Sequence, residues 1–554
     1  MRGWNHRTKR EATGYAIMPL NSDWRPSNRT PKISSQGHCA VRHIEGPSYR
    51  RGPRAFKTNL VHESAMSDLK RRTIRGGLAR LSAQGAGLLL RMVSIVVLAR
   101  LLRPSDFGLV GMVTAITGVL TLIRDFGLSA ATVQRSSITN EQISTLFWIN
   151  MLVGTLMSLV TAAIAPAIAH FYRQPQLYWI TLIVAAAFIF NAAGVQHSAL
   201  LQRQMRFTTW SVINVVSNGA GYALAVAGAV AGYGYWALVA TTVATPLVAT
   251  IGFWLTTAWV PGMPRASAEV RSMLHFGGTV TLSSLVAYSA YNADKVMIGR
   301  AWGADALGLY GRAYQLISTP IDCLHSGIGD VAFAVLSRLQ QEPARLRSYF
   351  LKTFSLALGL TVPITVMCAV FANDVVYVLL GPNWEGSVEI VRILAPTFAI
   401  LAITRPLPIL LDSAGLATRS LKMTLVFAPI ITTGYFIGLP YGPAGVAIAY
   451  LTVMSLWVVP FVLWCVRGTV VSAYDILQTA SQPLVSGILA GGVAYAAGLT
   501  CGASVSPVVR LALESSILFV VFFGTLILAA GQRSLYVELA RGVVRTAQVP
   551  TGAN

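Results

Sequence analysis

The sequence predicts an all-α integral membrane protein with about fourteen transmembrane helices. Hydrophobic residues make up 54% of its 554 residues, only 12% are charged, and the mean hydropathy is +0.58. A soluble chain cannot hide so much apolar surface in a core. Apolar runs of about 20 residues, the length that crosses a hydrocarbon layer of roughly 30 Å, recur between residues 78 and 531. We therefore expect this region to lie in the bilayer.

The expected spans follow one another with short polar connections that contain charged residues, glycine or proline. The first six spans are 78–102, 107–124, 145–169, 177–200, 209–231 and 234–258. The next eight are 273–299, 306–335, 353–380, 387–412, 420–439, 443–466, 480–499 and 508–531. Because no connection is long enough to form a soluble domain, we expect the activity to reside within the membrane.

The loops alternate between cation-rich and cation-poor, which predicts the orientation of the chain. The cation-rich loops hold Arg135; Arg203 and Arg206; Arg265 and Arg271; Arg338, Arg345, Arg347 and Lys352; Arg419 and Lys422; and Arg467. These loops should face the cytoplasm, which places both termini there. The net charge of +22 is spread over such loops and not clustered with aromatic residues. It therefore favours contact with anionic membrane lipids and argues against a nucleic-acid partner.

Residues 1–75 are expected to form a disordered, basic cytoplasmic extension. The first 65 residues are polar and contain no apolar segment of the kind that a secretory signal needs. Met66 opens "MSDLKRRTIRGG", which has the form of a short basic lead-in to a first membrane helix, and it is a candidate for the true start. The alternative is that the earlier segment is an arm that binds anionic lipids.

The chain also predicts two similar halves. An offset of 200 residues pairs "LARLLRPSDFGLV" with "IGRAWGADALGLY", and an offset of 210 pairs "GYGYWALVA" with "GPAGVAIAY". Six spans per copy keep both copies in one orientation, as in transporters with two lobes around a central cavity. We expect an N-lobe at 76–260, a C-lobe at 261–467, an accessory helix pair at 468–531 and a cytoplasmic tail at 532–554.

Charged residues inside the predicted spans are the candidate functional residues, because each costs roughly 2.5–3.5 kcal/mol at the centre of a bilayer. Arg80 and Arg91 are eleven positions apart, which brings them to nearly the same helix face. Asp294 and Lys295 are adjacent, so one should face the cavity while the other pairs with another helix. Further candidates are Arg124, Arg312 and Arg405.

These candidates differ in expected depth. Arg91 lies far from both ends of its span, which favours a functional position. An interfacial position is favoured for Arg100, Arg124, Arg300, Arg312 and Asp412, which are within reach of the membrane surface. A positively charged cavity suits an anionic substrate such as a diphosphate-linked lipid, since arginine binds phosphate oxygens through two parallel hydrogen bonds. An inside-negative membrane potential would favour outward movement of that head group.

Four stretches carry a resemblance to a known family: "LARLLRPSDFGLVGM", "DFGLSAATVQR", "GYGYWALVA" and "NADKVMIGRAWGADALGLYGRAYQL". Together they resemble the polysaccharide and oligosaccharide-lipid flippases of the multidrug/oligosaccharidyl-lipid/polysaccharide exporter superfamily, over residues 70 to 470. The resemblance implies two six-helix lobes, alternating access, and transfer of an isoprenoid-diphosphate-linked oligosaccharide from the cytoplasmic to the outer leaflet of a bacterial inner membrane. It implies a role in exopolysaccharide, other surface-polysaccharide or O-antigen biosynthesis.

By position, the resemblance implies that Arg80, Arg91 and Lys295 contact the substrate head group. Asp294, Arg124, Arg312 and Arg405 are the supporting charges. A polysaccharide polymerase and export proteins are candidate partners, and the resemblance implies no cofactor.

Two alternatives remain open at this point. A multidrug/cation antiporter would share the fold, but it is expected to carry an acidic residue in its first spans, and the first span here has arginines and no carboxylate. A membrane glycosyltransferase or glycan polymerase generally needs carboxylates on a sizeable external loop, whereas the outer loops here are short. No His, Cys and carboxylate cluster has metal-ligand spacing, and no catalytic Ser/His/Asp arrangement is visible. We therefore expect a transporter with no enzymatic activity and no metal site.

Overall fold

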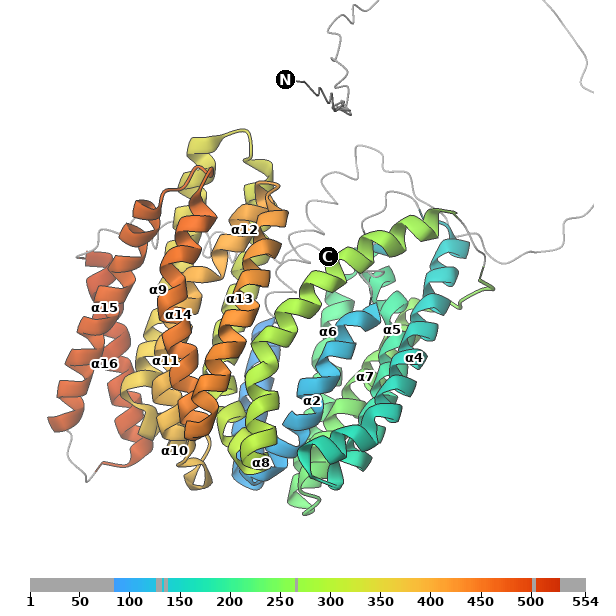
Figure 1. Cartoon of the computed structure of the whole chain (residues 1–554), viewed down its shortest axis with the longest axis horizontal. Helices are drawn as coiled ribbons and strands as arrows, with labels where there is room; N and C mark the ends of the chain where they lie inside the picture. Colours follow the sequence, from blue (N-terminus) through green and yellow to red (C-terminus); the bar gives the residue numbers. More distant parts are fainter. Residues whose placement is uncertain (1–83, 126–131, 134–137, 265–267, 501–504, 529–554) are drawn as a thin grey trace, which may run out of the picture. The chain divides into compact units, whose positions relative to one another are not determined.

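The computed structural model describes residues 84–125, 132–133, 138–264, 268–500 and 505–528. All the described residues belong to one compact unit within Glu63–Asn554. Every regular element in these ranges is a helix (Figure 1). Eleven helical segments in the described part are long and apolar enough to cross a membrane. The predicted all-α membrane class is thus confirmed, while the count of fourteen spans stays a prediction.

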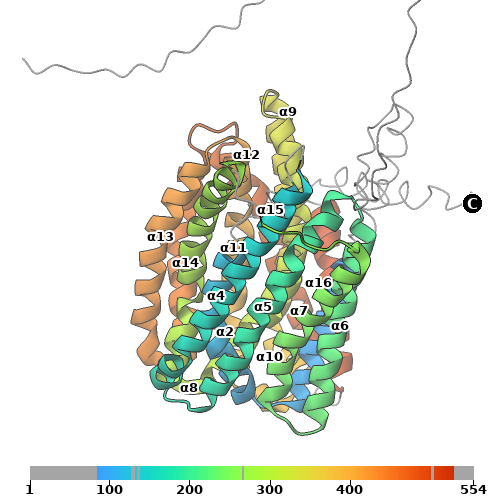
Figure 2. The same cartoon turned by 90° about the vertical axis from the view of Figure 1, so that its right-hand side faces the viewer.

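The first group of helices begins with a segment at Gln84–Leu101, followed by α2 (Pro104–Asp125). It continues with α4 (Asn140–Tyr172), α5 (Gln176–Arg203), α6 (Phe207–Val230) and α7 (Tyr235–Thr257). Helix α5 packs against α4 and α7, and α6 packs against α7 (Figure 2). Leu152 and Leu159 of α4 are 70% and 63% exposed, as expected of side chains that face lipid.

Helix α8 (Ala268–Arg338) is long enough to hold two of the predicted spans. Its backbone leaves the helical conformation at Gly303, where φ is +82°. Only glycine adopts this region without strain, so Gly303 permits the kink between the two helical halves of α8. The spans 273–299 and 306–335 stay predictions. Helix α8 packs against α2 in the first group and against α9, α11, α13 and α14 in the second. It therefore connects the two groups.

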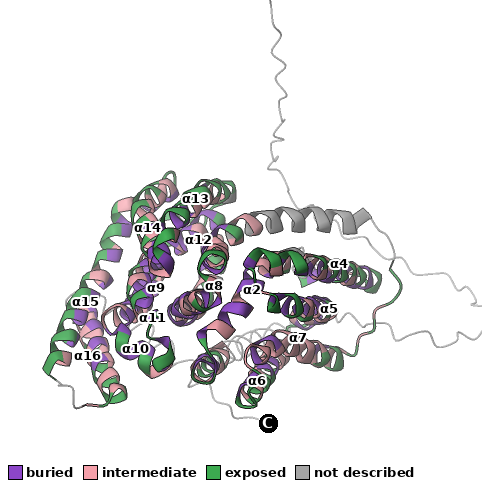
Figure 3. Cartoon of the chain, turned by 60° about the horizontal axis from the view of Figure 1, so that its bottom comes forward, coloured by how far each residue is buried: buried purple, intermediate pink, exposed green. Residues whose placement is uncertain are grey.

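The second group comprises α9 (Pro343–Val370), α10 (Ala372–Leu379), α11 (Ser387–Thr404), α12 (Pro406–Ser413), α13 (Ala417–Gly438) and α14 (Gly442–Val466). Two short 3₁₀ helices, η1 (Pro382–Trp384) and η2 (Leu439–Tyr441), lie in its connections. The last pair, α15 (Ala473–Thr500) and α16 (Pro507–Leu528), packs together, and α15 also packs on α9. Buried residues face neighbouring helices and exposed residues face outward (Figure 3). The predicted lobe boundaries remain predictions.

One predicted span is interrupted. The residues of span 387–412 form α11 and α12, which are separated at Arg405. Proline has no N–H, so Pro406 and Pro408 cannot complete the hydrogen bonds of a continuous helix at this point. Arg405 itself keeps helical dihedrals, with φ −62° and ψ −36°, and its N–H donates to the carbonyl oxygen of Leu401, so α12 continues the direction of α11 with fewer backbone hydrogen bonds.

Helix α2 contacts the second half of α8 at two glycines, Gly108 and Gly308. These two positions correspond to each other in the repeat with an offset of 200 residues. A Cβ on Gly108 would lie 1.7 Å from the carbonyl oxygen of Ala304. A Cβ on Gly308 would lie 1.9 Å from the carbonyl oxygen of Pro104. Only residues without a Cβ allow the two backbones to approach so closely. Positions 104 and 304 are themselves a pair at the same offset, so the two contacts are equivalent.

Further contacts hold the same end of these helices. The Arg100 guanidinium donates a hydrogen bond of 2.6 Å to the carbonyl oxygen of Val378. The Trp384 indole N–H donates one of 2.8 Å to the carbonyl oxygen of Ala99, and the Trp384 ring lies 5.4 Å from the Phe107 ring. The segment from α10 to η1 is thereby joined to the first helix and to α2.

Candidate functional site

A cavity of about 740 Å³ lies between the first helix, α2, α6, α7 and α8. Its volume is within the range of about 300–1,000 Å³ that is typical of small-molecule sites. We call it the cationic cavity, because its charged lining residues are three cations and one carboxylate: Arg91, Lys295, Arg312 and Asp322. The uncharged polar lining residues are Ser94, Thr114, Tyr222, Thr241, Thr242, Tyr288, Asn292, Tyr314, Gln315 and Ser318.

Arg91 lies on the first helix, where it lines the cavity with an exposed side chain. The Ser94 hydroxyl donates a hydrogen bond of 2.9 Å to the carbonyl oxygen of Arg91, which places both residues on one helix face. Among the described residues, no carboxylate lies within 4.0 Å of the Arg91 guanidinium. Arg91 thus lines the cavity as a cation without a carboxylate partner in the described part of the chain.

Lys295 lies on the first half of α8 and is 21% exposed in the cavity wall. Its ammonium donates a hydrogen bond of 2.9 Å to the Asn292 side-chain oxygen and lies 4.7 Å from the centre of the Tyr314 ring. The nearest carboxylate oxygen, from Asp294, is 3.6 Å away. These neighbours hold the cation in place and leave one side open to the cavity.

Asp294 does not line the cationic cavity and is only 1% exposed. Its carboxylate accepts a hydrogen bond of 2.9 Å from the Tyr310 hydroxyl and one of 2.7 Å from the Lys295 backbone N–H. Tyr310 belongs to the second half of α8, so this carboxylate ties the two halves together across Gly303. We expected these adjacent side chains to point to different sides, but their charged groups lie 3.6 Å apart and form an ion pair.

Arg312 lies in the cavity wall, and its expected interfacial depth stays a prediction. The residue is 9% exposed, and its guanidinium carbon lies 3.7 Å from the centre of the Phe107 ring. It also donates a hydrogen bond of 2.7 Å to the Gln315 side-chain oxygen. Cation–π contact with a desolvated ring stabilises a guanidinium away from water. The interfacial expectation considered distance along the helix and took no account of this aromatic partner.

The other candidate residues are not part of the described cavity. Arg405 lines a second pocket and forms an ion pair with Asp322, which lies on the cationic cavity. Arg80 and the side chain of Arg124 lie outside the part of the chain that the structure describes. Within the described ranges, no three His, Cys, Asp or Glu side chains are placed to hold a metal ion. The structure therefore brings together Arg91, Lys295 and Arg312.

Sequence reasoning missed the uncharged polar lining, because it considered charged residues alone. Tyr288, Asn292 and Lys295 follow one another at intervals of four and three residues. Gln315 and Asp322 lie three and ten positions after Arg312. Such intervals place side chains on one face of a helix. A search for polar residues at helical spacing around each predicted cation would have found them.

Comparisons with known proteins agree with this architecture. A family model described as Polysaccharide biosynthesis protein matches residues 97–389. The chain is 26% identical over 400 residues to the lipopolysaccharide biosynthesis protein WzxC of Escherichia coli (strain K12), covering 70% of this chain and 80% of that protein. It is also 26% identical over 381 residues to an uncharacterized membrane protein in the cps region of Klebsiella pneumoniae, covering 67% of this chain and 77% of that protein.

A solved structure also has the same fold. The lipid II flippase MurJ, in an inward closed conformation, matches with a TM-score of 0.65 and 11% sequence identity. The match covers 84% of this chain and 100% of that one. At this identity the likeness concerns the arrangement of helices, and it carries no information about individual side chains.

Proposed function

The chain belongs to the polysaccharide biosynthesis protein family, and from that premise we propose that it flips an isoprenoid-diphosphate-linked oligosaccharide across a bacterial inner membrane. The movement runs from the cytoplasmic to the outer leaflet and serves surface-polysaccharide, exopolysaccharide or O-antigen biosynthesis. The role is transport, in which no covalent bond is made or broken. It is supported by the names of the relatives and by the charge of the cationic cavity.

The charge of the cavity lining is the observation that carries the proposal. Arg91, Lys295 and Arg312 line the cavity, and its single lining carboxylate, Asp322, is paired with Arg405. Lys295 is itself paired with Asp294, which does not line the cavity, so Arg91 and Arg312 are the lining cations without a carboxylate partner among the described residues. A diphosphate carries about two negative charges, and guanidinium groups bind phosphate oxygens with strong, charge-assisted hydrogen bonds. We propose that Arg91 and Lys295, together with Arg80, contact the head group, and that Arg312 supports them.

The proposal also concerns the orientation of the chain in the membrane, the direction of transport and the partner proteins. We propose that both termini lie in the cytoplasm, which the distribution of Lys and Arg over the loops supports. An inside-negative potential then favours outward movement of the head group by about 2.3 kcal/mol per charge per 100 mV. The flipped oligosaccharide has to be consumed at the outer leaflet, so we propose a polysaccharide polymerase and export proteins as partners. The cation-rich loops would contact anionic lipids.

The test is genetic complementation with a direct measurement of the leaflet in which the glycan lies. The gene is deleted from its host and replaced by wild type, by Arg91→Ala or by Arg345→Ala. A membrane-impermeant glycan label on spheroplasts reports oligosaccharide in the outer leaflet. Deletion and Arg91→Ala should both leave complete lipid-linked oligosaccharide unlabelled. Arg345, which is 74% exposed and paired with Glu342, serves as the control arginine and should behave as wild type.

Other outcomes would contradict the proposal in distinct ways. An oligosaccharide that stops growing before it is complete would indicate an enzyme of assembly, such as a glycosyltransferase or polymerase. Normal labelling in the deletion strain would remove the flippase function and would direct attention to drug–cation antiport. Normal labelling in Arg91→Ala alone would show that this arginine is not a substrate contact.

A further inference from the structure

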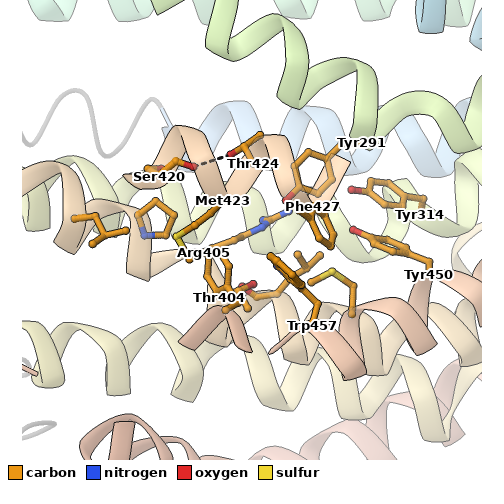
Figure 4. Close-up of a pocket in the computed structure, with 15 residues that line it drawn as sticks. Tyr291, Tyr314, Thr404, Arg405, Ser420, Met423, Thr424, Phe427, Tyr450 and Trp457 are labelled. Carbon is orange, nitrogen blue, oxygen red and sulfur yellow. Dashed lines mark hydrogen bonds between the residues drawn. The ribbon is translucent and has the colours of Figure 1, made fainter. Parts of the chain in front are cut away.

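A second pocket of about 370 Å³ lies in the second group of helices, at the break between α11 and α12 (Figure 4). We call it the aromatic pocket. Its aromatic lining residues come from both halves of α8, from α13 and from α14: Tyr291, Tyr314, Phe427, Tyr450, Trp457 and Phe461. Thr404, Arg405, Ser420 and Thr424 add polar groups. The volume is at the small end of the range of about 300–1,000 Å³ for ligand sites.

The aromatic pocket adjoins the cationic cavity through two shared structures. Tyr314 lines both spaces, and Lys295 lies over its ring from the side of the cationic cavity. Asp322 of the cationic cavity forms an ion pair with Arg405 of the aromatic pocket. Tyr314 and the Arg405–Asp322 ion pair thus form the boundary between the two spaces, so a ligand held at Lys295 lies next to the aromatic pocket.

Several polar groups of the aromatic pocket have no protein partner. The hydroxyls of Tyr291, Tyr314 and Tyr450 make no hydrogen bond with any described residue. The hydroxyls of Tyr314 and Tyr450 point to the same side in the close-up (Figure 4). Tyr450 as a whole is only 2% exposed and lines the pocket, and tyrosine hydroxyls in such surroundings usually have a hydrogen-bond partner. These groups are the kind that a polar ligand satisfies.

We propose that the aromatic pocket binds a sugar unit of the transported glycan while the cationic cavity holds the diphosphate. This inference rests on the function proposed above and assigns the sugar to a site of its own. A sugar ring has an apolar C–H face and a rim of hydroxyls. The rings of Phe427 and Trp457, whose centres are 5.5 Å apart with planes inclined at 33°, each offer an apolar face for the first. The free tyrosine hydroxyls and the Arg405–Asp322 pair can form hydrogen bonds with the sugar hydroxyls.

An isoprenoid chain fits this pocket less well. It would bury the Arg405–Asp322 ion pair and the tyrosine hydroxyls without forming any hydrogen bond to them, and such burial is unfavourable. The apolar surfaces that suit an isoprenoid lie instead on the exposed faces of the outer helices, such as Leu456 of α14, which is 73% exposed.

Equilibrium binding to the full-length protein in lipid nanodiscs tests the proposal with two probes. One probe is isoprenyl diphosphate without sugar, and the other is lipid-linked oligosaccharide extracted from the deletion strain. Tyr450→Phe should weaken binding of the sugar-bearing probe about three- to tenfold and leave the sugar-free probe unchanged, because one hydrogen bond is lost. Tyr435→Phe is the matched control, since its buried hydroxyl also has no partner but lies outside the pocket.

A second variant tests the apolar surface. Trp457→Leu keeps an apolar side chain but removes the flat ring, and it should weaken only the sugar-bearing probe, by about tenfold. Trp464 belongs to the same helix and does not line the pocket, so Trp464→Leu is its control.

The outcomes separate the sugar site from the diphosphate site. Equal weakening of both probes by Tyr450→Phe would assign the pocket to the isoprenoid and overturn the proposal, as would no weakening of either probe. Arg91→Ala should weaken both probes. If Arg91→Ala binds both as wild type does while Tyr450→Phe discriminates between them, the diphosphate site is refuted and the sugar site stands. If the wild type binds neither probe, the proposed function and the sugar site both fail.

Discussion

Gly308→Ala should separate α2 from α8 and thereby open one end of the cationic cavity. The new Cβ would lie 1.9 Å from the carbonyl oxygen of Pro104, whereas real Cβ contacts are essentially never shorter than 3.0 Å. The obstacle is backbone, so the helices have to move apart by about 1 Å. Overpacking of this kind costs about 1–3 kcal/mol. This strain exists only while α2 and α8 are in contact at Gly308. Because each 1.4 kcal/mol is a factor of ten, the ratio of molecules with separated helices to molecules with packed helices should rise about 5- to 140-fold.

A reporter cysteine measures this opening. Leu98 lines the cavity near the crossing and is 4% exposed, so Leu98→Cys in a background without the native cysteines should react slowly with a membrane-impermeant maleimide. Adding Gly308→Ala should raise the labelling rate at least fivefold. Whole cells and inside-out vesicles are labelled in parallel, and the side that shows the increase identifies the orientation of the crossing.

Gly311→Ala supplies the matched control for labelling. It lies one turn further along α8, and a Cβ there has no neighbour within 4 Å. It should leave the labelling rate unchanged. If Gly308→Ala labels no faster than Gly311→Ala on either side of the membrane, the two helices do not form the glycine contact, and the reasoning is wrong.

The remaining predictions concern stability, measured as the free energy of unfolding in detergent. Tyr310→Phe removes the hydroxyl that donates to buried Asp294 and should cost about 1–3 kcal/mol, whereas Tyr435→Phe, which loses no partner, should cost much less; equal costs would contradict the role of Asp294 as a tie between the halves of α8. Gly438→Leu should cost about 1–3 kcal/mol or more, because a Cβ there would lie 2.4 Å from the Gly445 carbonyl oxygen. If Gly438→Leu leaves the free energy of unfolding unchanged, α13 and α14 do not pack closely at this glycine.

The membrane class and two of the cavity cations were predictable from the sequence for physical reasons. A bilayer requires long apolar helices, so their length and spacing appear directly in the chain. A deep charge in such a helix needs water or a polar partner, which made Arg91 and Lys295 stand out as candidates. The glycines of the 200-residue repeat were also visible, although their role in a backbone contact was not.

Other features depended on partners that are distant in sequence. The position of Arg312 in its span says nothing of the ring of Phe107 and the side chain of Gln315, which hold it in the cavity wall. Arg405 looked like a further cavity cation, yet its partner Asp322 lies 83 residues earlier and its side chain lines another pocket.

Composition, the lengths of apolar runs and the positions of charges were thus enough to identify a helical membrane transporter with a positively charged interior. Which cations share a cavity, which are paired, and where unpartnered tyrosine hydroxyls gather were decided by tertiary packing. The reason is that hydropathy depends on each residue and its neighbours along the chain, whereas ion pairs, cation–π contacts and cavity walls form between helices. Those contacts depend on how the helices cross, as α2 and α8 do at Gly108 and Gly308.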